Sequence, residues 1–264
     1  MVWKFPNPLE FKSKEPIEQR KFSSENRTLA DMSVFTFLKC IARINKYQHI
    51  RKYRKHPGLT AMIPDFSVKM SFGLHQGWAI EGAIGSFFKI DASYLSPNVN
   101  MASRVTAASA QYGVPFLVSG ELTPVLSKDV MKIMREVDTV KVKGSDKPMK
   151  LFTVDVQTDD MNEVTDRFKK LLIKDKKRML DRERFVLWES IKRKAMSTMS
   201  LFRNDADFSS LRKNYDKIFA NLWKEAYGAY IDGDWSKAHR LLKDGQTLNP
   251  DDGPTKTIMN VIET

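Results

Sequence analysis

The spacing of hydrophobic positions predicts one long helix followed by strands in the first third of the chain. From Leu29 to His56, apolar residues recur at helical spacing and form one stripe beside lysines and arginines. The dipeptide Pro57-Gly58 is expected to end this helix. Residues 67–72 alternate apolar and polar positions, which is typical of a half-buried strand, and the glycine-punctuated stretch 73–85 is expected to pair with it.

A second helix is predicted in the middle of the chain. A loop over residues 86–97 is expected to lead into a helix that Asn98 caps and Gly113 ends. A short strand over residues 114–119 follows this helix.

The next residues predict short helices and then a hairpin. Residues 121–135 have the pattern of short helices, while 137–143 and 149–156 are β-rich runs separated by turn residues. Helices and strands therefore alternate over residues 28–156, which predicts an α+β fold.

Composition changes near residue 160, and the pattern predicts three regions in sequence order. Residues 1–156 form the α+β region, and residues 157–217, rich in charged side chains, are expected to be a charged helical linker. Residues 218–264 hold two helical patterns separated at Gly233-Asp234, a spacing that resembles one tetratricopeptide helix pair.

Composition excludes several classes of protein. The chain has 264 residues, a formal net charge of +12 and a single cysteine, so an intrachain disulfide framework is excluded and a reducing, intracellular location is expected. No apolar run reaches the length of a membrane span, and the N-terminus lacks the pattern of a signal peptide. On these grounds the chain, taken by itself, is expected to be soluble.

The positive charge is concentrated in two stretches, residues 1–60 and 161–217, while the centre is close to neutral. Such stretches are typical of solvated helix faces, but they also leave open a basic helical scaffold that binds nucleic acid or acidic membrane through residues 161–217. Because no base-reading motif is present, nucleic acid is not expected as a partner.

The most informative stretch is residues 73–119, which carries several short motifs in a fixed order. Glycines surround a histidine, then an aspartate follows, and then a helix begins with the letters V-N-M-A-S-R. These residues are Gly73, His75, Gly77, Gly82, Gly85, Asp91 and residues 99–104, and a V-K-G hairpin lies within residues 140–154. His75 has no second histidine or cysteine nearby, so a buried or hydrogen-bonded histidine is expected rather than a metal ligand.

This ordered set of motifs resembles the class III nucleotidyl cyclases, the adenylate and guanylate cyclases. The residues between the motifs are similar to those of the large multidomain cyclases of protists. The resemblance covers roughly residues 29–156. It implies a ferredoxin-like catalytic domain, present here in part and followed by an α-helical C-terminal region.

The resemblance also implies roles for four side chains. Asn100 would orient the ribose and Arg104 would bind the phosphate in the transition state, while Lys143 would bind the terminal phosphates and Asp91 the purine edge. Asn100 and Arg104 lie four positions apart and so share one helix face near the N-terminus, where an anion is favoured. Taken singly, each also fits a plainer role: a helix cap for Asn100, a surface ion pair for Arg104, a solvated turn for Lys143 and a loop carboxylate for Asp91.

Two motifs of the family are absent from the sequence. The family begins with an F-x-D-I strand and a later Gly-Asp hairpin, whose aspartates hold paired metal ions, and neither stands here. The letters V-W-K-F after Met1 resemble the strand that follows that hairpin, so the chain is expected to start inside the catalytic domain. The intact enzyme would use Mg²⁺ or Mn²⁺, with no metal ligands in this chain, and the chain alone is expected to be inactive.

The resemblance implies cyclic nucleotide synthesis in intracellular signal transduction. The substrate would be a nucleoside triphosphate, ATP in preference to GTP, and the products a cyclic monophosphate and pyrophosphate. Because cyclases of this class build their site at a dimer interface, a homodimer or a pairing with a second cyclase domain is expected. Relatives often carry membrane segments upstream. The alternative is a catalytically incomplete regulatory or binding module that acts with a partner cyclase domain.

Overall fold

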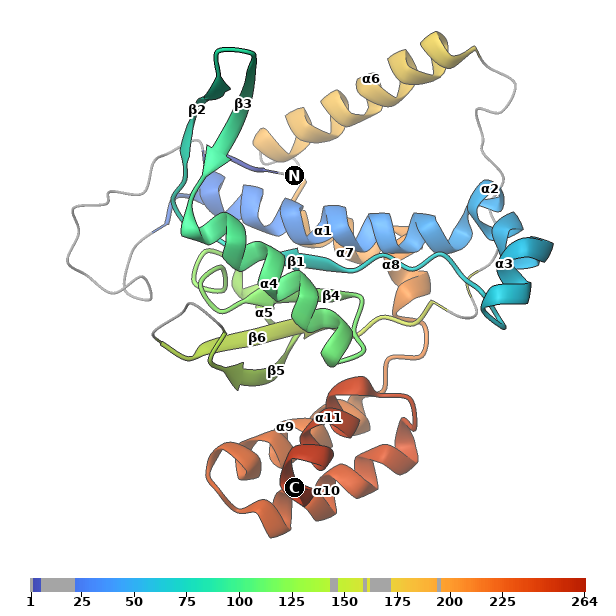
Figure 1. Cartoon of the computed structure of the whole chain (residues 1–264), viewed down its shortest axis with the longest axis vertical. Coiled ribbons are helices and arrows are strands. Elements are labelled where there is room, and N and C mark those ends of the chain that lie inside the picture. The colour runs from blue at the N-terminus through green and yellow to red at the C-terminus, as the bar shows by residue number, and fades with distance from the viewer. Residues whose placement is uncertain (1, 6–21, 143–146, 159–160, 162–171, 194–195) are drawn as a thin grey trace. The chain divides into compact units, whose positions relative to one another are not determined.

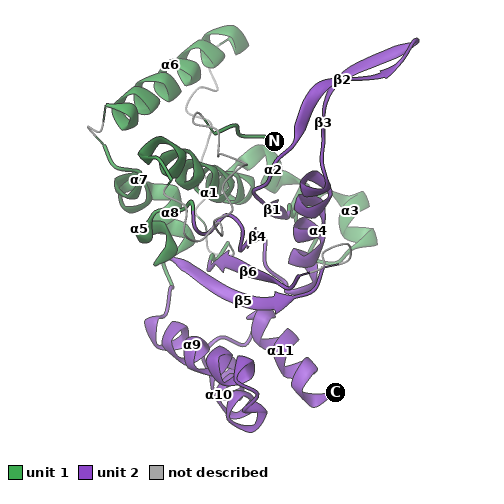
Figure 2. Ribbon diagram, turned by 90° about the vertical axis from the view of Figure 1, so that its left-hand side faces the viewer, with its two compact units in different colours: residues 1–70, 125–132, 156–214 green, residues 71–124, 133–155, 215–264 purple. Residues whose placement is uncertain are grey.

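The computed structural model has mixed α/β architecture and divides into two compact units that interleave along the sequence (Figures 1 and 2). The contacts between residues therefore do not follow the three consecutive regions that the sequence pattern predicts. The structure describes residues 2–5, 22–142, 147–158, 161, 172–193 and 196–264. Unit 1 is formed by residues 1–70, 125–132 and 156–214, and unit 2 by residues 71–124, 133–155 and 215–264.

Unit 1 is built around the long helix that the apolar stripe predicts. Val34, Leu38 and Ile41 are buried on that stripe. The helix ends at Lys46 rather than at His56, because Tyr47 turns to an extended conformation with ψ of 125°. The helices of unit 1 are α1 (Ser24–Lys46), α2 (Gln48–Arg51), η2 (Lys52–Lys55), α3 (Pro57–Met62), α5 (Lys128–Met131), α6 (Ile173–Lys192), α7 (Thr198–Asn204) and α8 (Ala206–Leu211).

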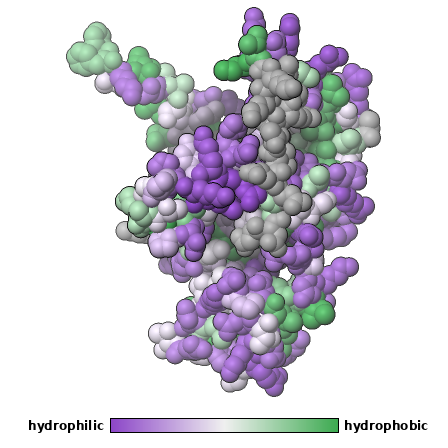
Figure 3. Space-filling view, turned by 90° about the vertical axis from the view of Figure 1, so that its right-hand side faces the viewer, coloured by the Kyte–Doolittle hydropathy of each residue, from purple (hydrophilic) through white to green (hydrophobic). Residues whose placement is uncertain are grey.

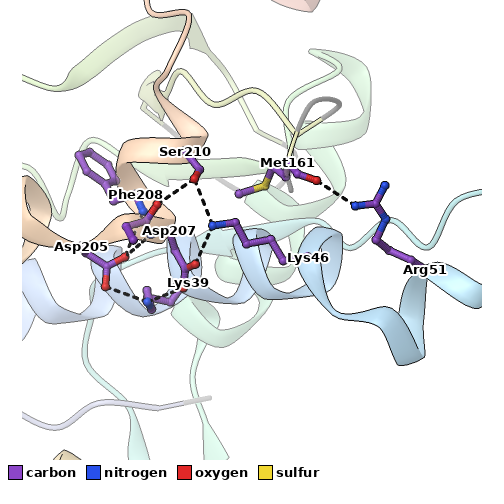
Figure 4. A network of polar contacts seen from close by, with 9 residues as sticks. Lys39, Lys46, Arg51, Met161, Asp205, Asp207, Phe208 and Ser210 are labelled. Atoms are coloured by element: carbon purple, nitrogen blue, oxygen red, sulfur yellow. Dashed lines mark hydrogen bonds and ion pairs between the residues drawn. The ribbon is translucent and has the colours of Figure 1, made fainter. Parts of the chain in front are cut away.

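The charged stretch after residue 156 contains helices of two kinds. Most of α6 is exposed, as expected for a charged linker. Helices α7 and α8 instead pack on α1, where the rings of Phe35 and Phe202 meet edge to face with centroids 5.3 Å apart. Around this contact, Lys39 pairs with Asp205 at 2.8 Å and Lys46 with Asp207 at 3.0 Å (Figure 4).

Unit 2 contains a four-stranded sheet in the order β1-β4-β6-β5 and a separate two-stranded hairpin, β2-β3. Strands β1 and β4 are parallel, and the other neighbouring pairs are antiparallel. The core between the sheet and α4 includes Val105, Leu117 and Leu151, all fully buried. The strands are β1 (Phe72–Leu74), β2 (Ile80–Ser86), β3 (Lys89–Leu95), β4 (Phe116–Ser119), β5 (Met134–Val140) and β6 (Met149–Val154), and the helices are α4 (Pro97–Gln111), α9 (Lys217–Ile231), α10 (Trp235–Leu248) and α11 (Gly253–Glu263).

Two predictions about the first strands are wrong. Residues 67–72 do not pair with 73–85: β1 begins only at Phe72 and pairs with β4, while β2 pairs with β3. The predicted loop over 86–97 is mostly strand β3, since residues Ile80 to Ser86 pair one to one with Leu95 to Lys89. The whole turn of this hairpin is the pair Phe87-Phe88.

The predicted helix after residue 97 is confirmed, but its cap differs. Ser96, not Asn98, is the N-cap, and its side chain accepts a hydrogen bond from the Asn98 amide at 3.0 Å. Gly113 follows the helix with φ of +62°, the left-handed conformation that ends helices.

The region before the hairpin has less helix than predicted. Within residues 121–135 the structure has one short helix, α5, and β5 already begins at Met134. The closing hairpin is confirmed, since β5 and β6 pair antiparallel from Met134↔Val154 to Val140↔Met149.

The C-terminal helices share a small core in which Trp223, Leu242 and Ile258 are buried. The break between α9 and α10 falls where the pattern predicts it, at Gly233, which has φ of +82°. The likeness of this helix pair to a tetratricopeptide unit stays a prediction. Among the described residues, each helix is too short or too polar to cross a membrane.

Candidate functional site

The first half of α4 presents the two side chains to which the resemblance gives catalytic roles. Asn100 is exposed and Arg104 is partly exposed, one helical turn further along the same face. Neither side chain has a hydrogen bond or an ion pair with the rest of the described chain. Helix capping and a surface ion pair, the plainer roles, therefore find no support here, and both groups are available to a ligand.

Two glycines bring the N-terminal half of α4 against the end of β1. A Cβ atom on Gly73 would lie 2.3 Å from the Thr106 amide nitrogen and 2.8 Å from the Ala102 carbonyl oxygen, both in α4. A Cβ atom on Gly77 would lie 2.2 Å from Cγ of Asn98. A larger residue at Gly73 would push against the helix backbone, whereas one at Gly77 would displace the Asn98 side chain that bonds His75.

His75, between these glycines, joins the end of β4 to the first turn of α4. Its side chain is only 4% exposed. Nδ1 lies 2.8 Å from Oγ of Ser119, and Nε2 lies 3.1 Å from Oδ1 of Asn98. The prediction of a hydrogen-bonded histidine is therefore confirmed.

The partners of Asn98 indicate which nitrogen of His75 carries the proton. Nδ2 of Asn98 donates to the carbonyl oxygen of Trp78 at 2.9 Å and to Oγ of Ser96 at 3.1 Å, which leaves Oδ1 as an acceptor facing His75. Nε2 of His75 therefore donates to Asn98, while Nδ1 faces the Ser119 hydroxyl and lies 3.6 Å from Oε2 of Glu121. This chain of bonds fixes the first turn of α4 to the strand ends, and so fixes where Asn100 and Arg104 point.

Asp91 lies in another part of unit 2. It is in β3, opposite Ile84, rather than in the predicted loop. Its side chain is 65% exposed and lies 3.3 Å from Nζ of Lys89. Within the described residues no hydrogen bond or ion pair links Asp91 to Asn100 or Arg104, so its role at a purine edge stays a prediction. Lys143 lies outside the described residues.

The β2-β3 hairpin is an exposed apolar arm (Figure 1). Phe87 and Phe88 at its tip are 96% and 95% exposed, and Ile80, Ile90 and Leu95 are each at least 60% exposed. Figure 3 shows hydrophobic side chains at the end of this projecting arm. Exposed apolar surface of this extent is typical of a surface that another molecule covers.

The divalent ions that the resemblance implies have no evident ligands in the described part of the chain. That part contains no group of three or more His, Cys, Asp or Glu residues that could hold a metal ion. The described residues therefore offer no set of side chains that fits a divalent ion.

Comparison with known proteins finds that part of this chain is similar to adenylate cyclases. No family model matches it. An adenylate cyclase of Anabaena cylindrica is 31% identical over 88 residues, which is 33% of this chain and 18% of that protein. Adenylate cyclase 1 of Rhizobium meliloti is 30% identical over 92 residues, which is 35% of this chain and 13% of that protein. The photoactivated adenylate cyclase subunit alpha of Euglena gracilis is 35% identical over 80 residues, which is 30% of this chain and 8% of that protein.

The matches cover part of each protein. The chain spans less than a fifth of the length of these curated relatives. Among solved structures, a bacterial light-regulated adenylyl cyclase is 20% identical with a TM-score of 0.35, over 49% of this chain and 34% of that one. The ordered motifs of residues 73–104 and these partial matches agree: part of this chain is similar to adenylate cyclases, and the chain resembles the class III nucleotidyl cyclases.

Proposed function

We propose that this chain supplies the Asn100 and Arg104 side of the nucleotide site of a cyclase. The reaction would convert a nucleoside triphosphate, ATP in preference to GTP, into the cyclic monophosphate and pyrophosphate. The observation that carries this proposal is the exposed face of α4, where neither side chain has a partner within the described residues, above a first turn fixed by His75. The names of the relatives that match the chain support the substrate class.

The chemistry asks for positioning and for neutralisation of charge. The ribose 3′-hydroxyl releases its proton to solvent as its oxygen attacks the α-phosphorus, the bond to the bridging oxygen breaks, and pyrophosphate leaves with that electron pair. The planar guanidinium of Arg104 can donate two parallel hydrogen bonds to phosphate oxygens as negative charge develops on them. Asn100, one turn earlier, can accept from a ribose hydroxyl or donate to its oxygen and so orient the sugar.

Lys143 and Asp91 would complete the substrate contacts. Lys143 follows β5 by three residues, and its ammonium group would bind the terminal phosphates. Asp91 would accept a hydrogen bond from the purine, and an exocyclic amino group of adenine is a suitable donor. The resemblance also implies Mg²⁺ or Mn²⁺, whose ligands would come from outside the described residues.

A second cyclase domain would complete the site, either as a homodimer or as a different partner. The exposed apolar arm β2-β3 supports this proposal, because burying Phe87 and Phe88 against a partner would remove two large rings from water. The alternative expected from the sequence, a regulatory module without turnover of its own, differs in what happens after a metal-competent partner is added.

The test is binding of fluorescent N-methylanthraniloyl ATP and GTP to the purified full chain. We expect Arg104→Ala to weaken binding by at least about tenfold, since a hydrogen bond to a charged group is worth about 1.5–3 kcal/mol. Asn100→Ala should weaken binding by about threefold to tenfold, and ATP should bind more tightly than GTP. Ser103→Ala, an exposed change on the same helix, is the matched control and should leave binding unchanged.

Equal affinities of the wild-type chain and Arg104→Ala would refute the proposal. A second measurement adds a metal-competent cyclase domain and follows cyclic nucleotide. Product that appears only in the mixture and disappears with Arg104→Ala would support a chain that contributes catalytic residues. Binding without product in any mixture would favour the regulatory module.

A further inference from the structure

The second half of α1 and the short helices after it carry a run of uncompensated positive charge. Between Asp31 and Asp65 the chain has seven Lys or Arg residues and no Asp or Glu. Two of the seven, Lys39 and Lys46, are paired with carboxylates of unit 1. The other five form the basic patch: Arg43 in α1, Arg51 in α2, and Lys52, Arg54 and Lys55 in η2.

Within the described residues, no cation of the basic patch has a carboxylate partner. Nη1 of Arg51 donates to the Met161 carbonyl oxygen at 2.9 Å, and Nη2 of Arg54 donates to Oδ1 of Asn45 at 3.3 Å. Both acceptors are neutral, so they hold the guanidinium groups in place without cancelling their charge. The other three side chains of the patch are exposed: Arg43, Lys52 and Lys55.

The geometry of η2 brings like charges together. Residues three apart in a 3₁₀ helix project in the same direction, so the side chains of Lys52 and Lys55 share one side of η2. Two ammonium groups on one side of a helix repel each other, and the other cations of the patch add to this repulsion. The arrangement is therefore unfavourable in the isolated chain and becomes favourable against a negatively charged surface.

Two exposed apolar side chains lie next to the basic patch, at the end of α3. This helix begins at Pro57, directly after η2, and contacts it. Its last residue, Met62, is 81% exposed, and the C-cap residue Ile63 is 55% exposed. Figure 3 faces the side on which α2 and α3 lie in Figure 1, and it shows a dense hydrophilic patch there. This part of unit 1 thus combines positive charge with accessible apolar surface.

We propose that the basic patch, together with Met62 and Ile63, is a docking surface for a bilayer of anionic phospholipids. The cations would lie at the level of the lipid phosphate and carboxylate groups, while the two apolar side chains would enter the boundary with the acyl chains. A nucleic acid would also attract the cations, but it offers no apolar layer for Met62 and Ile63, whereas a bilayer offers both. This docking is independent of the nucleotide site proposed for α4.

The test is cosedimentation of the purified full chain with sucrose-loaded vesicles of phosphatidylcholine that contain about 30% phosphatidylserine. We expect the double substitution Lys52→Gln and Lys55→Gln to weaken binding by about twentyfold, because each cation near an anionic surface contributes about fivefold. The matched control is Lys224→Gln with Lys243→Gln, which removes the same charge from exposed positions of α9 and α10. The control should change binding by less than about twofold, since charges distant from the bilayer are screened.

Met62→Gln tests the apolar part of the docking surface. It should weaken vesicle binding by about fivefold, because a polar side chain gains nothing from leaving water at the acyl boundary. Leu248→Gln is the matched control, since Leu248 is the last residue of α10 and is 48% exposed. The contribution of charge is measured separately with salt: in 0.5 M NaCl, which screens charges within about 4 Å, the wild-type chain should lose most of its binding.

Several results would overturn the docking surface. Equal binding to vesicles with and without phosphatidylserine would mean that anionic lipid is not recognised, and equal binding by the wild-type chain and the Lys52 and Lys55 variant would mean that the patch is not the contact. Loss of vesicle binding in Phe87→Ser but not in Met62→Gln would assign the apolar contact to the β2-β3 arm. Affinity for a duplex oligonucleotide, without affinity for vesicles, would make the patch a nucleic-acid surface.

Membrane docking and the proposed nucleotide site can fail separately. The Lys52 and Lys55 variant should bind N-methylanthraniloyl ATP as the wild-type chain does, because neither lysine belongs to the nucleotide site. Vesicle binding by a chain that binds no nucleotide would keep the docking surface and remove the nucleotide site, and the converse result would remove the docking surface alone.

Discussion

Two ionic clusters, one in each unit, attach C-terminal segments to earlier elements, and they do so in physically different ways. In unit 2, Arg135 is enclosed between Asp155 and Asp252 and lies over the Trp223 ring. In unit 1, Lys39 and Lys46 reach Asp205 and Asp207 from α1 (Figure 4). The carboxylates of this second cluster are 20% and 21% exposed, whereas Asp252 is 7% exposed.

This difference in exposure determines how each attachment can be broken. A buried guanidinium with fixed bidentate geometry cannot exchange its partner Asp252 for water, so losing it leaves that carboxylate uncompensated in the interior, while Asp155 is 25% exposed. In the second cluster Lys46 is only 8% exposed, but Lys39, Asp205 and Asp207 are 20–23% exposed, so water and salt compete with these ion pairs and each pair contributes less. The Arg135 cluster is therefore suited to a permanent attachment, and the cluster of Lys39 and Lys46 to a contact that can break and form again.

Arg135→Met should produce the largest effect. The substitution leaves the buried Asp252 without its cation, which typically costs about 3–5 kcal/mol. We expect the free energy of unfolding of unit 2 to fall by about that amount in urea titrations followed by tryptophan fluorescence. Arg240→Met, an exposed change on α10, serves as control and should alter stability by less than about 0.5 kcal/mol. If both substitutions were equally mild, the ion pairs of Arg135 would not hold the C-terminal helices in place.

Lys46→Met should have a smaller and salt-dependent effect. It removes the 3.0 Å ion pair with Asp207 and the 3.1 Å hydrogen bond to Ser210, but Asp207 keeps Lys39 as a partner. We expect unit 1 to lose about 1 kcal/mol at low ionic strength, and this loss should shrink in 0.5 M NaCl, a concentration at which exposed charges are screened within about 4 Å.

The pH dependence of this second cluster has a definite sign. Burial alone would raise the pKa of Asp207, but the hydrogen bonds and charges of Lys39 and Lys46 outweigh it and lower the pKa. Asp207 therefore stabilises the fold above the ordinary carboxyl pKa, and this contribution is lost as the pH falls through the lowered value. The stability change caused by Arg43→Met, an exposed substitution on the same helix, should depend on neither salt nor pH. If the stability lost in Lys46→Met did not change with salt, the ion pairs of this cluster would behave like those of the buried Arg135.

Local patterns predicted much of this fold because they reflect local physics. The apolar stripe of α1 and the helix stop at Gly113 depend on residues close in sequence, and both are present. Strand β3 was missed although a signal exists, since Ile90, Ala92 and Tyr94 alternate with polar residues over positions 89–94. The Ser96 cap was missed although a signal exists, since Pro97 is a typical first residue of a helix.

Long-range contacts explain the rest of what the sequence did not reveal. The spacing of Asn100 and Arg104 predicted their common helix face, but the partners of His75 lie 23 and 44 residues away. Arg135 and Asp252 are 117 residues apart, and no local pattern connects a strand to a helix start at that distance. Motifs therefore indicated the chemistry of the site, while the residues that hold it in place emerged only from tertiary packing.

Asp31→Asn should have the smallest effect on stability. Asp31 is buried like Arg135 but belongs to unit 1, which contains the Lys39 and Lys46 ion pairs, so it extends the comparison between the two clusters. Its carboxylate accepts from the Ser127 amide at 2.9 Å and from Thr198 at 2.8 Å. Burial raises the pKa of Asp31 above its ordinary value, and these hydrogen bonds offset the shift only in part.

The folded state therefore holds this proton more tightly than the unfolded state. The resulting stability is fully present below the ordinary carboxyl pKa of 3.8 and is lost as the pH rises through the raised folded value. Asparagine does not titrate, so Asp31→Asn should gain on the wild-type chain, by about 1 kcal/mol or less, as the pH increases across that window. Urea midpoints at pH 3.5, 5 and 7 measure this difference, with the exposed Asp175→Asn as control. If the difference stayed constant with pH, the hydrogen bonds from Ser127 and Thr198 would cancel the effect of burial on the pKa of Asp31. Asp31 would then resemble the ion pairs of Asp205 and Asp207 rather than the buried Arg135.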